Sequence, residues 1–191
     1  MAGRQAKIIA PAQLAQLLRH VRGYPDPVRS RVIVLLSVKA GLRAAEIAQI
    51  EWCMVLDASG RVSDSIEIDD RIAKKGSGRR VPMHPLLRET LVALHKRSDG
   101  TGPIIRSERG WAMRPNSIVN WFVTLYREVG LEGCSSHSGR RTFITQAARM
   151  THKAGGSLRD VQLLAGHRSV ETTQSYIEGD TAAQRRLVAL L

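Results

Sequence analysis

The sequence is short of cysteine, of aromatic side chains and of acidic groups, and each shortage excludes a class of protein. The only two cysteines among the 191 residues, Cys53 and Cys134, are far apart and form no CxxC pair. They cannot build a disulfide framework, and this sparse use of cysteine predicts a reducing, cytoplasmic setting. Aromatic residues make up only 4% of the chain, which argues against a single-strand nucleic-acid binder built on stacked rings.

Long apolar runs are also missing. A helix that spans a bilayer needs about 20 consecutive apolar residues, and no stretch of the chain approaches that length. The first residues, MAGRQAKIIAP, lack the apolar segment of a secretory signal peptide. The chain is long enough to bury a core. We therefore expect one domain, or one domain with a small appendage, and no membrane partner.

Positive charge is what the chain has in excess. Lysine and arginine total 29 against 17 acidic residues, which gives a formal charge of +12. Such an excess attracts polyanions, of which nucleic acid is the first expectation and an anionic membrane surface the second. The basic residues form no concentrated block and no basic amphipathic anchor. The charge therefore favours a nucleic-acid partner over a membrane.

Apolar residues recur at helical spacing along most of the chain. Pro11 and the Asp26-Pro27 pair are typical helix starts, whereas Gly23 and Gly41 are typical ends. The predicted helices span about 11–23, 27–41, 43–50, 85–97, 116–130, 138–150, 158–165 and 170–177, with a last apolar stripe in the tail TAAQRRLVALL.

Between residues 52 and 82 the pattern changes. WCMVLD and SIEID alternate or are β-branched, and RIAKKGSGRRVPM has the form of a hairpin with KKGSG at its tip. GPIIRS, further on, is a short strand or extended segment. The predicted fold class is therefore mainly α (α+β), a helical core with a small three-stranded antiparallel sheet inserted after the third helix.

Residues 134–176 hold the most specific set of polar groups. His137 and Arg140 lie one helical turn apart, so both can reach one small group. Gly166-His167 ends a helix, and Tyr176 follows on the next short one. Two imidazoles, a guanidinium and a phenol at one point suggest phosphate chemistry with tyrosine as nucleophile. The alternative is that His167 is a helix cap and Tyr176 an ordinary amphipathic residue.

Two further basic positions come from the first half of the chain. Arg43, at the start of a helix, can bind an anion beside free backbone N–H groups, or it can simply pair with Glu46 three residues later. Lys74 and Lys75 stand at the hairpin tip, where they are either solvated charges or a finger that enters a DNA groove. No carboxylate or cysteine stands at metal-ligand spacing near His137, so we predict no metal site.

Taken in order, the segments AGLRAAEI, KKGSGRRVP, HSGRRTF and LLAGHRSVETTQSY resemble the catalytic domain of tyrosine recombinases, the phage integrase family. The resemblance covers the chain from about residue 11 onward. It implies a catalytic domain over 11–178 and a tail helix over 179–191 that packs on its own domain or on a neighbouring subunit. Residues 1–10, ahead of the first predicted helix, are expected to be a flexible lead-in. The matched catalytic positions are Arg43, Lys74 (with Lys75 as substitute), His137, Arg140, His167 and Tyr176.

The family's chemistry supplies roles for these residues as expectations. Tyr176 would attack a DNA phosphodiester to form a 3′-phosphotyrosyl link, with the two arginines on the non-bridging oxygens. His137 would accept the tyrosine proton, His167 would donate a hydrogen bond, and Lys74 would protonate the departing 5′ oxygen. The bond energy stays in the covalent intermediate, so no metal, nucleotide or other cofactor is expected. The expected DNA contacts outside the catalytic set are Lys75, Arg79, Arg80 and Arg141.

The same resemblance implies partners and leaves alternatives. The expected partner is double-stranded DNA, with the protein in the cytoplasm and associated with the nucleoid. The DNA is expected to be bound by a homo-oligomer (a tetramer), with an accessory DNA-binding protein as a further partner, in the recombination or integration of a mobile element. Two departures stand out: Ser138-Gly139 replaces the common Asp-Leu between His and Arg, and the usual N-terminal helical domain is missing. The alternatives are relaxation of supercoils in the manner of type IB topoisomerases, a DNA-binding protein without catalysis, and a basic RNA-binding protein.

Overall fold

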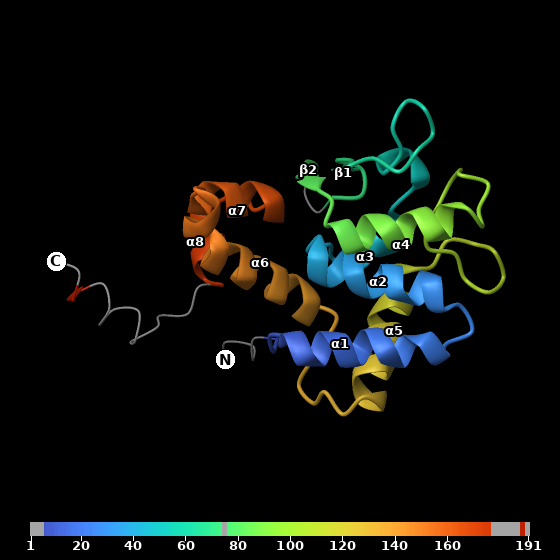
Figure 1. The fold of residues 1–191 in the computed structure, drawn as a ribbon, viewed down its shortest axis with the longest axis horizontal. Helices are drawn as coiled ribbons and strands as arrows, with labels where there is room; N and C mark the ends of the chain where they lie inside the picture. The colour runs from blue at the N-terminus through green and yellow to red at the C-terminus, as the bar shows by residue number, and fades with distance from the viewer. Residues whose placement is uncertain (1–5, 74–75, 177–187, 190–191) are drawn as a thin grey trace.

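The computed structural model describes residues 6–73, 76–176 and 188–189. Its helices and strands follow one another along the chain as drawn in Figure 1. The elements are α1 (Pro11–His20), η1 (Val21–Gly23), α2 (Pro27–Lys39), α3 (Ala44–Gln49), η2 (Trp52–Met54), β1 (Ser65–Ile68), β2 (Arg79–Pro82), α4 (Pro85–His95), α5 (Pro115–Glu128), α6 (Ser138–Met150), η3 (His152–Ala154), α7 (Leu158–Ala165) and α8 (Val170–Gln174).

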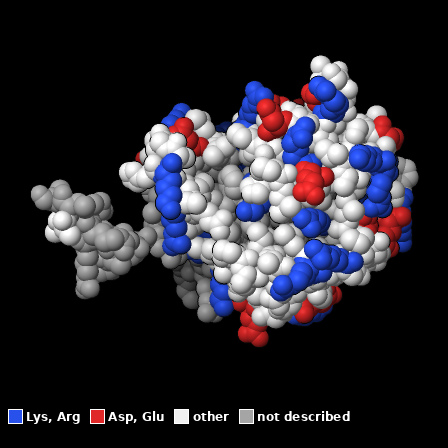
Figure 2. Space-filling model, viewed as in Figure 1, with Lys and Arg blue, Asp and Glu red and all other residues white. Residues whose placement is uncertain are grey.

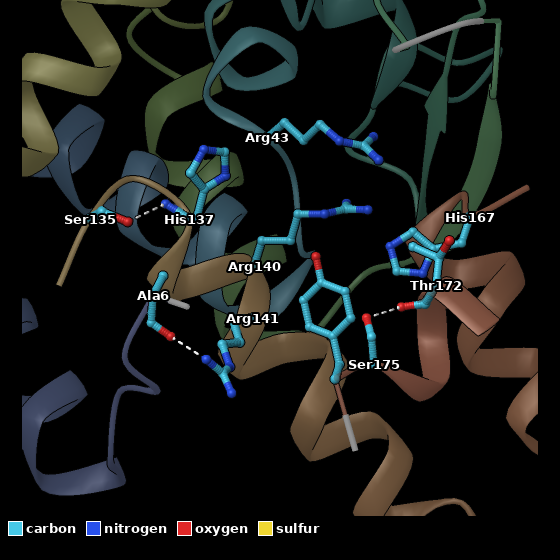
Figure 3. A pocket seen from close by; sticks show the side chains of 10 residues that line it. Ala6, Arg43, Ser135, His137, Arg140, Arg141, His167, Thr172 and Ser175 are labelled. Atoms are coloured by element: carbon cyan, nitrogen blue, oxygen red, sulfur yellow. Dashed lines mark hydrogen bonds between the residues drawn. The ribbon is translucent and has the colours of Figure 1, made fainter. Parts of the chain in front are cut away.

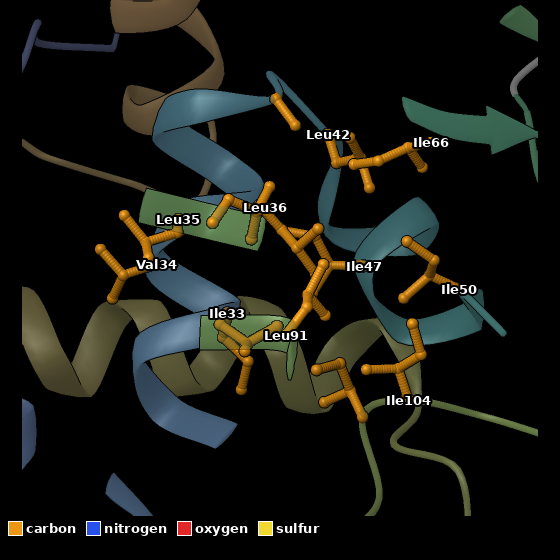
Figure 4. Close-up of a cluster of buried hydrophobic side chains, with 14 of the residues drawn as sticks. Ile33, Val34, Leu35, Leu36, Leu42, Ile47, Ile50, Ile66, Leu91 and Ile104 are labelled. Carbon is orange, nitrogen blue, oxygen red and sulfur yellow. The ribbon is translucent and has the colours of Figure 1, made fainter. Parts of the chain in front are cut away.

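Helix α2 forms the centre of the larger part of the molecule, called here the body (residues 6–142). Every residue from Val32 to Val38 is buried, so this stretch of the helix is covered on all sides by other elements. It packs against α3, α4 and α6. Its start is fixed as the sequence predicts, because the Asp26 side chain accepts a hydrogen bond from Arg29 N at 3.1 Å. Figure 4 shows the cluster of apolar side chains around it.

The small sheet is antiparallel but has two strands in the described part of the chain. β1 pairs with β2 in a register that sets Ile66 opposite Val81, and both side chains are buried. The predicted third strand, WCMVLD, is wrong: Trp52–Met54 form a 3-10 turn, and only Leu56 makes an isolated bridge. The Trp52 carbonyl accepts from the backbone of Val55 and Leu56, both at 3.0 Å. A buried–exposed–buried pattern over three residues fits such a turn as well as a strand.

The predicted lead-in is packed where the structure describes it. Ile9 is 1% exposed, and its backbone N–H donates to Thr142 Oγ1 at 2.8 Å. The carbonyl of Ala6 accepts a hydrogen bond from Arg141 at 2.8 Å. Residues 6–10 are therefore attached to α6 instead of being loose. Most of the predicted tail, 179–191, lies outside the described residues, and only positions 188 and 189 are described.

Residues 143–176 form a second, smaller unit, called here the small lobe, which Figure 1 shows beside the body with α6 leading into it. Its core consists of Ile144, Val161 and Ala165, with Leu158 and Tyr176 packed around them. The bounds of α6 and α7 agree with those predicted from the sequence. α8 also begins as predicted but ends earlier, at Gln174.

Helix α6 joins the two parts and approaches α2 very closely at Gly139. A Cβ placed there would clash with Ser37 Oγ and would lie 2.8 Å from Ser37 Cβ and 3.1 Å from its carbonyl carbon. The backbone of one helix is thus pressed against the other, which leaves no room for a side chain. Ser138, next to it, accepts a hydrogen bond from Ser135 N at 3.0 Å. The Ser138-Gly139 departure from the family pattern thus has a local packing reason.

We predict that Gly139→Ala destabilises the protein by about 1–3 kcal/mol, because overpacking outweighs the usual helical preference for alanine. Gly23→Ala is the matched control, since nothing lies within 4 Å of a Cβ at that position. It should be neutral or slightly stabilising. Urea unfolding measures both, and a stabilised Gly139→Ala variant would contradict the packing argument.

Candidate active site

A pocket of about 500 Å³ lies between the body and the small lobe. Figure 3 shows the side chains that surround it. They include five of the six predicted catalytic residues, brought together from four separate segments. The lining residues are Ala6, Arg43, Ser135, His137, Arg140, Arg141, His167, Thr172, Ser175 and Tyr176. The predicted hairpin lysine, Lys74, and its substitute, Lys75, lie outside the described residues.

Arg43 is held at the start of α3 by a buried carboxylate. Its side chain contacts Glu46 Oε1 at 2.8 Å, and its backbone N–H donates to Glu46 Oε2 at 2.8 Å. The pairing considered above as the alternative to an anion-binding role is therefore present. It coexists with a place in the pocket, because the side chain of Arg43 is still 22% exposed. Glu46 orients the arginine without removing it from the pocket.

Glu46 also binds Arg79, so one carboxylate joins two arginines. The Nη1 and Nη2 atoms of Arg79 lie 3.0 Å from Oε1 and Oε2 of Glu46, a bidentate pair. Glu46 is 0% exposed, and its burial acts to raise its pKa. The hydrogen bonds and charge of Arg79, joined by those of Arg43, outweigh burial and lower the pKa below its ordinary value. The carboxylate is therefore ionised at neutral pH.

Arg79 is not an exposed DNA contact in this structure. Its side chain is only 5% exposed, and its Nε donates to the carbonyl of Leu164 at 2.9 Å. β2 turns this side chain inward, toward α3 and α7, so the structure differs from the exposed position that the hairpin pattern predicts. Arg80, the next residue along, points outward with 67% of its side chain exposed, and it pairs with Glu67 at 3.0 Å.

Arg140 lies deep in the pocket and connects the two parts of the molecule. Its Nη1 donates to the carbonyl of Gly41 and its Nη2 to that of Ala165, both at 2.6 Å. Burial, followed by the charge of Arg43, lowers the pKa of Arg140 to about 10, so the side chain is still charged at pH 7. Figure 3 shows the guanidinium groups of Arg43 and Arg140 directed to the same side, toward His167.

His167 follows the left-handed Gly166 that ends α7. Burial, followed by the charges of Arg140 and Arg43, lowers its pKa to about 4, so its ring is neutral at pH 7. Its Nδ1 lies 2.9 Å from Thr173 Oγ1. The ring stacks on Tyr176 with 5.4 Å between centroids.

His137 and Arg141 line the pocket from the start of α6. His137 is the N-cap residue and is exposed, and its backbone N–H donates to Ser135 Oγ at 3.3 Å. Arg141 is 7% exposed and is bonded to Ala6 O. The predicted DNA contact at Arg141 is therefore a residue of the pocket wall.

Tyr176 is positioned by its backbone and by its ring. Its N–H donates to the carbonyl of Thr173 at 3.1 Å, and its carbonyl accepts from Thr145 Oγ1 at 3.2 Å. The ring packs against the core of the small lobe. These contacts fix the backbone of Tyr176 while its side chain lines the pocket.

The site can bind an anion and bring a nucleophile to it. Two guanidinium groups of the pocket are fixed by buried partners, and a neutral imidazole and a phenol lie beside them. Such groups suit the oxygens of a tetrahedral anion. Within the described residues, no cluster of three or more His, Cys, Asp or Glu side chains could hold a metal ion. Nor is any described helix long and apolar enough to span a membrane.

The sequence does not predict the roles of three residues in this site: Glu46, Arg79 and Thr173. Glu46 was noted only as a partner of Arg43, although the i,i+3 spacing was the visible signal. The link from Arg79 to Glu46 crosses 33 positions, and no local pattern reveals it. Only its position between His167 and Tyr176 in the sequence connects Thr173 with the site.

We predict that Glu46→Gln lowers the free energy of unfolding at pH 7 by about 3 kcal/mol, because it leaves a buried Arg79 without its counter-charge. The folded-state pKa of Glu46 lies below its ordinary value of 4.5. This stabilisation is therefore complete above the unfolded-state pKa and is lost as pH falls through the folded-state pKa. The difference between wild type and variant should shrink as the solution is acidified below about pH 4.

Glu132→Gln, at an exposed position, is the control for this acid titration. It should leave the unfolding curve nearly unchanged at every pH. Denaturant unfolding between pH 3 and pH 8 measures all three proteins, and a Glu46→Gln variant as stable as wild type at pH 7 would contradict the role given to the carboxylate.

Comparison with known proteins agrees with this geometry. The sequence model of the phage integrase family matches residues 7–182. A tyrosine recombinase XerC from Rickettsia typhi is 28% identical over 170 residues, which cover 84% of this chain and 52% of the relative. The chain thus spans about half the length of that relative.

Two solved structures share the fold. The Tn1549 transposon integrase in complex with a circular intermediate DNA superposes with a TM-score of 0.75 at 17% identity, covering 100% of this chain and 67% of that one. The XerA recombinase superposes with a TM-score of 0.74 at 19% identity, covering 100% and 65%. Since the family model spans nearly all of the 191 residues, this chain belongs to the phage integrase family.

Proposed function

We propose that this chain is the catalytic part of a site-specific DNA recombinase that cuts and rejoins DNA through a 3′-phosphotyrosyl intermediate. The observation that supports this most is the meeting of Tyr176 with Arg43, Arg140, His137 and His167 in one pocket. A protein that only binds DNA has no need of a phenol beside two guanidinium groups. Membership of the phage integrase family points the same way.

In the proposed cleavage step, Tyr176 Oη attacks the phosphorus of a DNA phosphodiester. A bond forms between Oη and phosphorus while the bond to the 5′ oxygen breaks. His137 accepts the tyrosine proton, and Lys74, or Lys75 in its place, protonates the departing 5′ oxygen. Arg43 and Arg140 hold the non-bridging oxygens and offset the charge that develops between reactants and intermediate.

The second half of the proposed reaction reverses the first. A 5′-hydroxyl from a partner strand attacks the phosphotyrosyl bond and releases Tyr176. One phosphoester replaces another at each step, so the bond energy is conserved and neither a metal nor a nucleotide cofactor has to supply it. His167, neutral at pH 7, donates a hydrogen bond to the phosphoryl oxygen without adding a third full charge.

The proposed partner is double-stranded DNA. The formal charge of +12 favours binding to a polyanion. Figure 2 shows lysine and arginine side chains spread over the body and the small lobe, with acidic side chains between them. Such a distribution suits a long backbone better than a single small anion. Because exchange between two duplexes needs four strand cleavages, we propose that four copies act together on DNA, with a further DNA-binding protein or domain contributing to site choice.

Covalent capture tests this function. The protein is incubated with a library of nicked duplexes of randomised sequence, in which cleavage releases a short fragment and prevents rejoining. Wild type should form an adduct that survives denaturing electrophoresis. Tyr176→Phe should form none, and Arg43→Gln should form it about 10²–10³-fold more slowly.

Tyr126→Phe is the matched control, because Tyr126 is buried in the body away from the pocket. This variant should form the adduct as wild type does. The proposal fails if wild type forms no adduct with any member of the library, or if Tyr176→Phe forms it normally.

A further inference from the structure

One buried hydroxyl in α8 connects two residues of the pocket. Thr173 is 0% exposed and lies six residues after His167 and three before Tyr176. Its Oγ1 is 2.9 Å from His167 Nδ1, and its carbonyl accepts the N–H of Tyr176 at 3.1 Å. Within the described residues, His167 is the only hydrogen-bond partner of this hydroxyl.

The donors and acceptors at this contact distinguish the two neutral tautomers of His167, with the ring proton on Nδ1 or on Nε2. A neutral imidazole has one N–H donor and one acceptor nitrogen, and a threonine hydroxyl has one proton to donate. If Nδ1 held the ring proton, the hydroxyl would accept it, and the hydroxyl's own proton would be buried without a partner. If Nδ1 is the acceptor, the hydroxyl donates to it and both groups are satisfied. The second arrangement avoids the cost of an unpaired buried donor.

The imidazole of His167 is neutral at pH 7, so one of its two nitrogens is an acceptor. Burial, Arg140 from α6, Arg43 before α3 and Arg79 from β2 all disfavour a charged ring and bring its pKa to about 4. The ring of Tyr176 covers one face of the imidazole. Among the described residues, these are the groups whose charges act on His167, and none of them is a carboxylate that would stabilise the imidazolium form.

We propose that Thr173 is a positioning residue that sets His167 in the tautomer with its proton on Nε2. The ring then has its donor on the nitrogen that Thr173 does not occupy, which is the one left for an oxygen in the pocket. Because the carbonyl of the same residue holds the Tyr176 N–H, Thr173 also keeps the imidazole and the phenol in register. The tautomer is a property of the free protein, whereas its use toward a phosphoryl oxygen rests on the proposed function.

The tautomer can be read directly by long-range ¹H–¹⁵N correlation on labelled protein at pH 7 without DNA. The chain has six histidines, and His167→Gln identifies the His167 signals by their disappearance. Wild type should show an unprotonated Nδ1 and a protonated Nε2. Thr173→Val, which keeps the shape but removes the donor, should lose this pattern, and Thr173→Ser should restore it.

Thr90→Val is the matched control. Thr90 is also buried in a helix, α4, but its hydroxyl donates to the carbonyl of Leu86 at 2.7 Å. This variant should leave the His167 signals and covalent capture unchanged. Thr173→Val should slow capture about tenfold, the loss expected when one hydrogen bond no longer orients the ring, and Thr173→Ser should recover most of the rate.

Two results would overturn the inference: a wild-type ring protonated on Nδ1, or a Thr173→Val variant that keeps the wild-type tautomer. The first needs no variant, so it stands even if Thr173→Val does not fold. If wild type shows the expected tautomer but forms no adduct with DNA, the tautomer assignment holds and its catalytic use is refuted. If the adduct forms while the tautomer is the other one, the function holds and the role of Thr173 is refuted.

Discussion

The arrangement of the pocket depends on one buried carboxylate. Glu46 has no exposed surface and binds Arg43 on one side and Arg79 on the other. Arg140 stands close enough that the charges of both arginines act on its pKa. Without a counter-charge, three guanidinium groups at one place would repel one another and would each pay for burial. With it, the cationic centre is assembled before any anion arrives.

The same charges join the two parts of the molecule. The body has a large apolar core around α2, whereas the core of the small lobe is centred on three residues. Arg79 reaches the carbonyl of Leu164 and Arg140 that of Ala165, so two arginines satisfy carbonyls at the end of α7 that the helix itself leaves unpaired. A cation near a helix C-terminus is favourable. Here the two cations also hold the end of α7, and so the position of His167, which follows it. The site therefore lies where the body meets the small lobe, and these polar contacts join the two parts together with the packing of Leu164 on the core of the body.

Much of the fold and part of the site could be predicted from local sequence patterns. The bounds of α6 and α7 follow from periodicity and from Gly166, and the order of basic and histidine motifs indicates the family. The differences between the predicted and the observed structure have two causes. WCMVLD satisfies strand and 3-10 patterns equally, and burial of Trp52 decides between them. The inward turn of Arg79 and the bond from Thr173 to His167 depend on tertiary contacts that charge and spacing do not reveal, so a basic hairpin predicts an exposed side chain at Arg79.

The central claim, that Glu46 and Arg79 act as one unit, is tested most directly by a double-mutant cycle of unfolding free energies. The cycle uses Glu46→Gln, Arg79→Met and the double variant, measured by urea unfolding at pH 7. The two positions should be coupled by about 2 kcal/mol or more, so that the double variant loses less stability than the sum of the single variants. Additive losses within about 0.5 kcal/mol would contradict the account, because they would mean that the carboxylate and the guanidinium stabilise the fold independently.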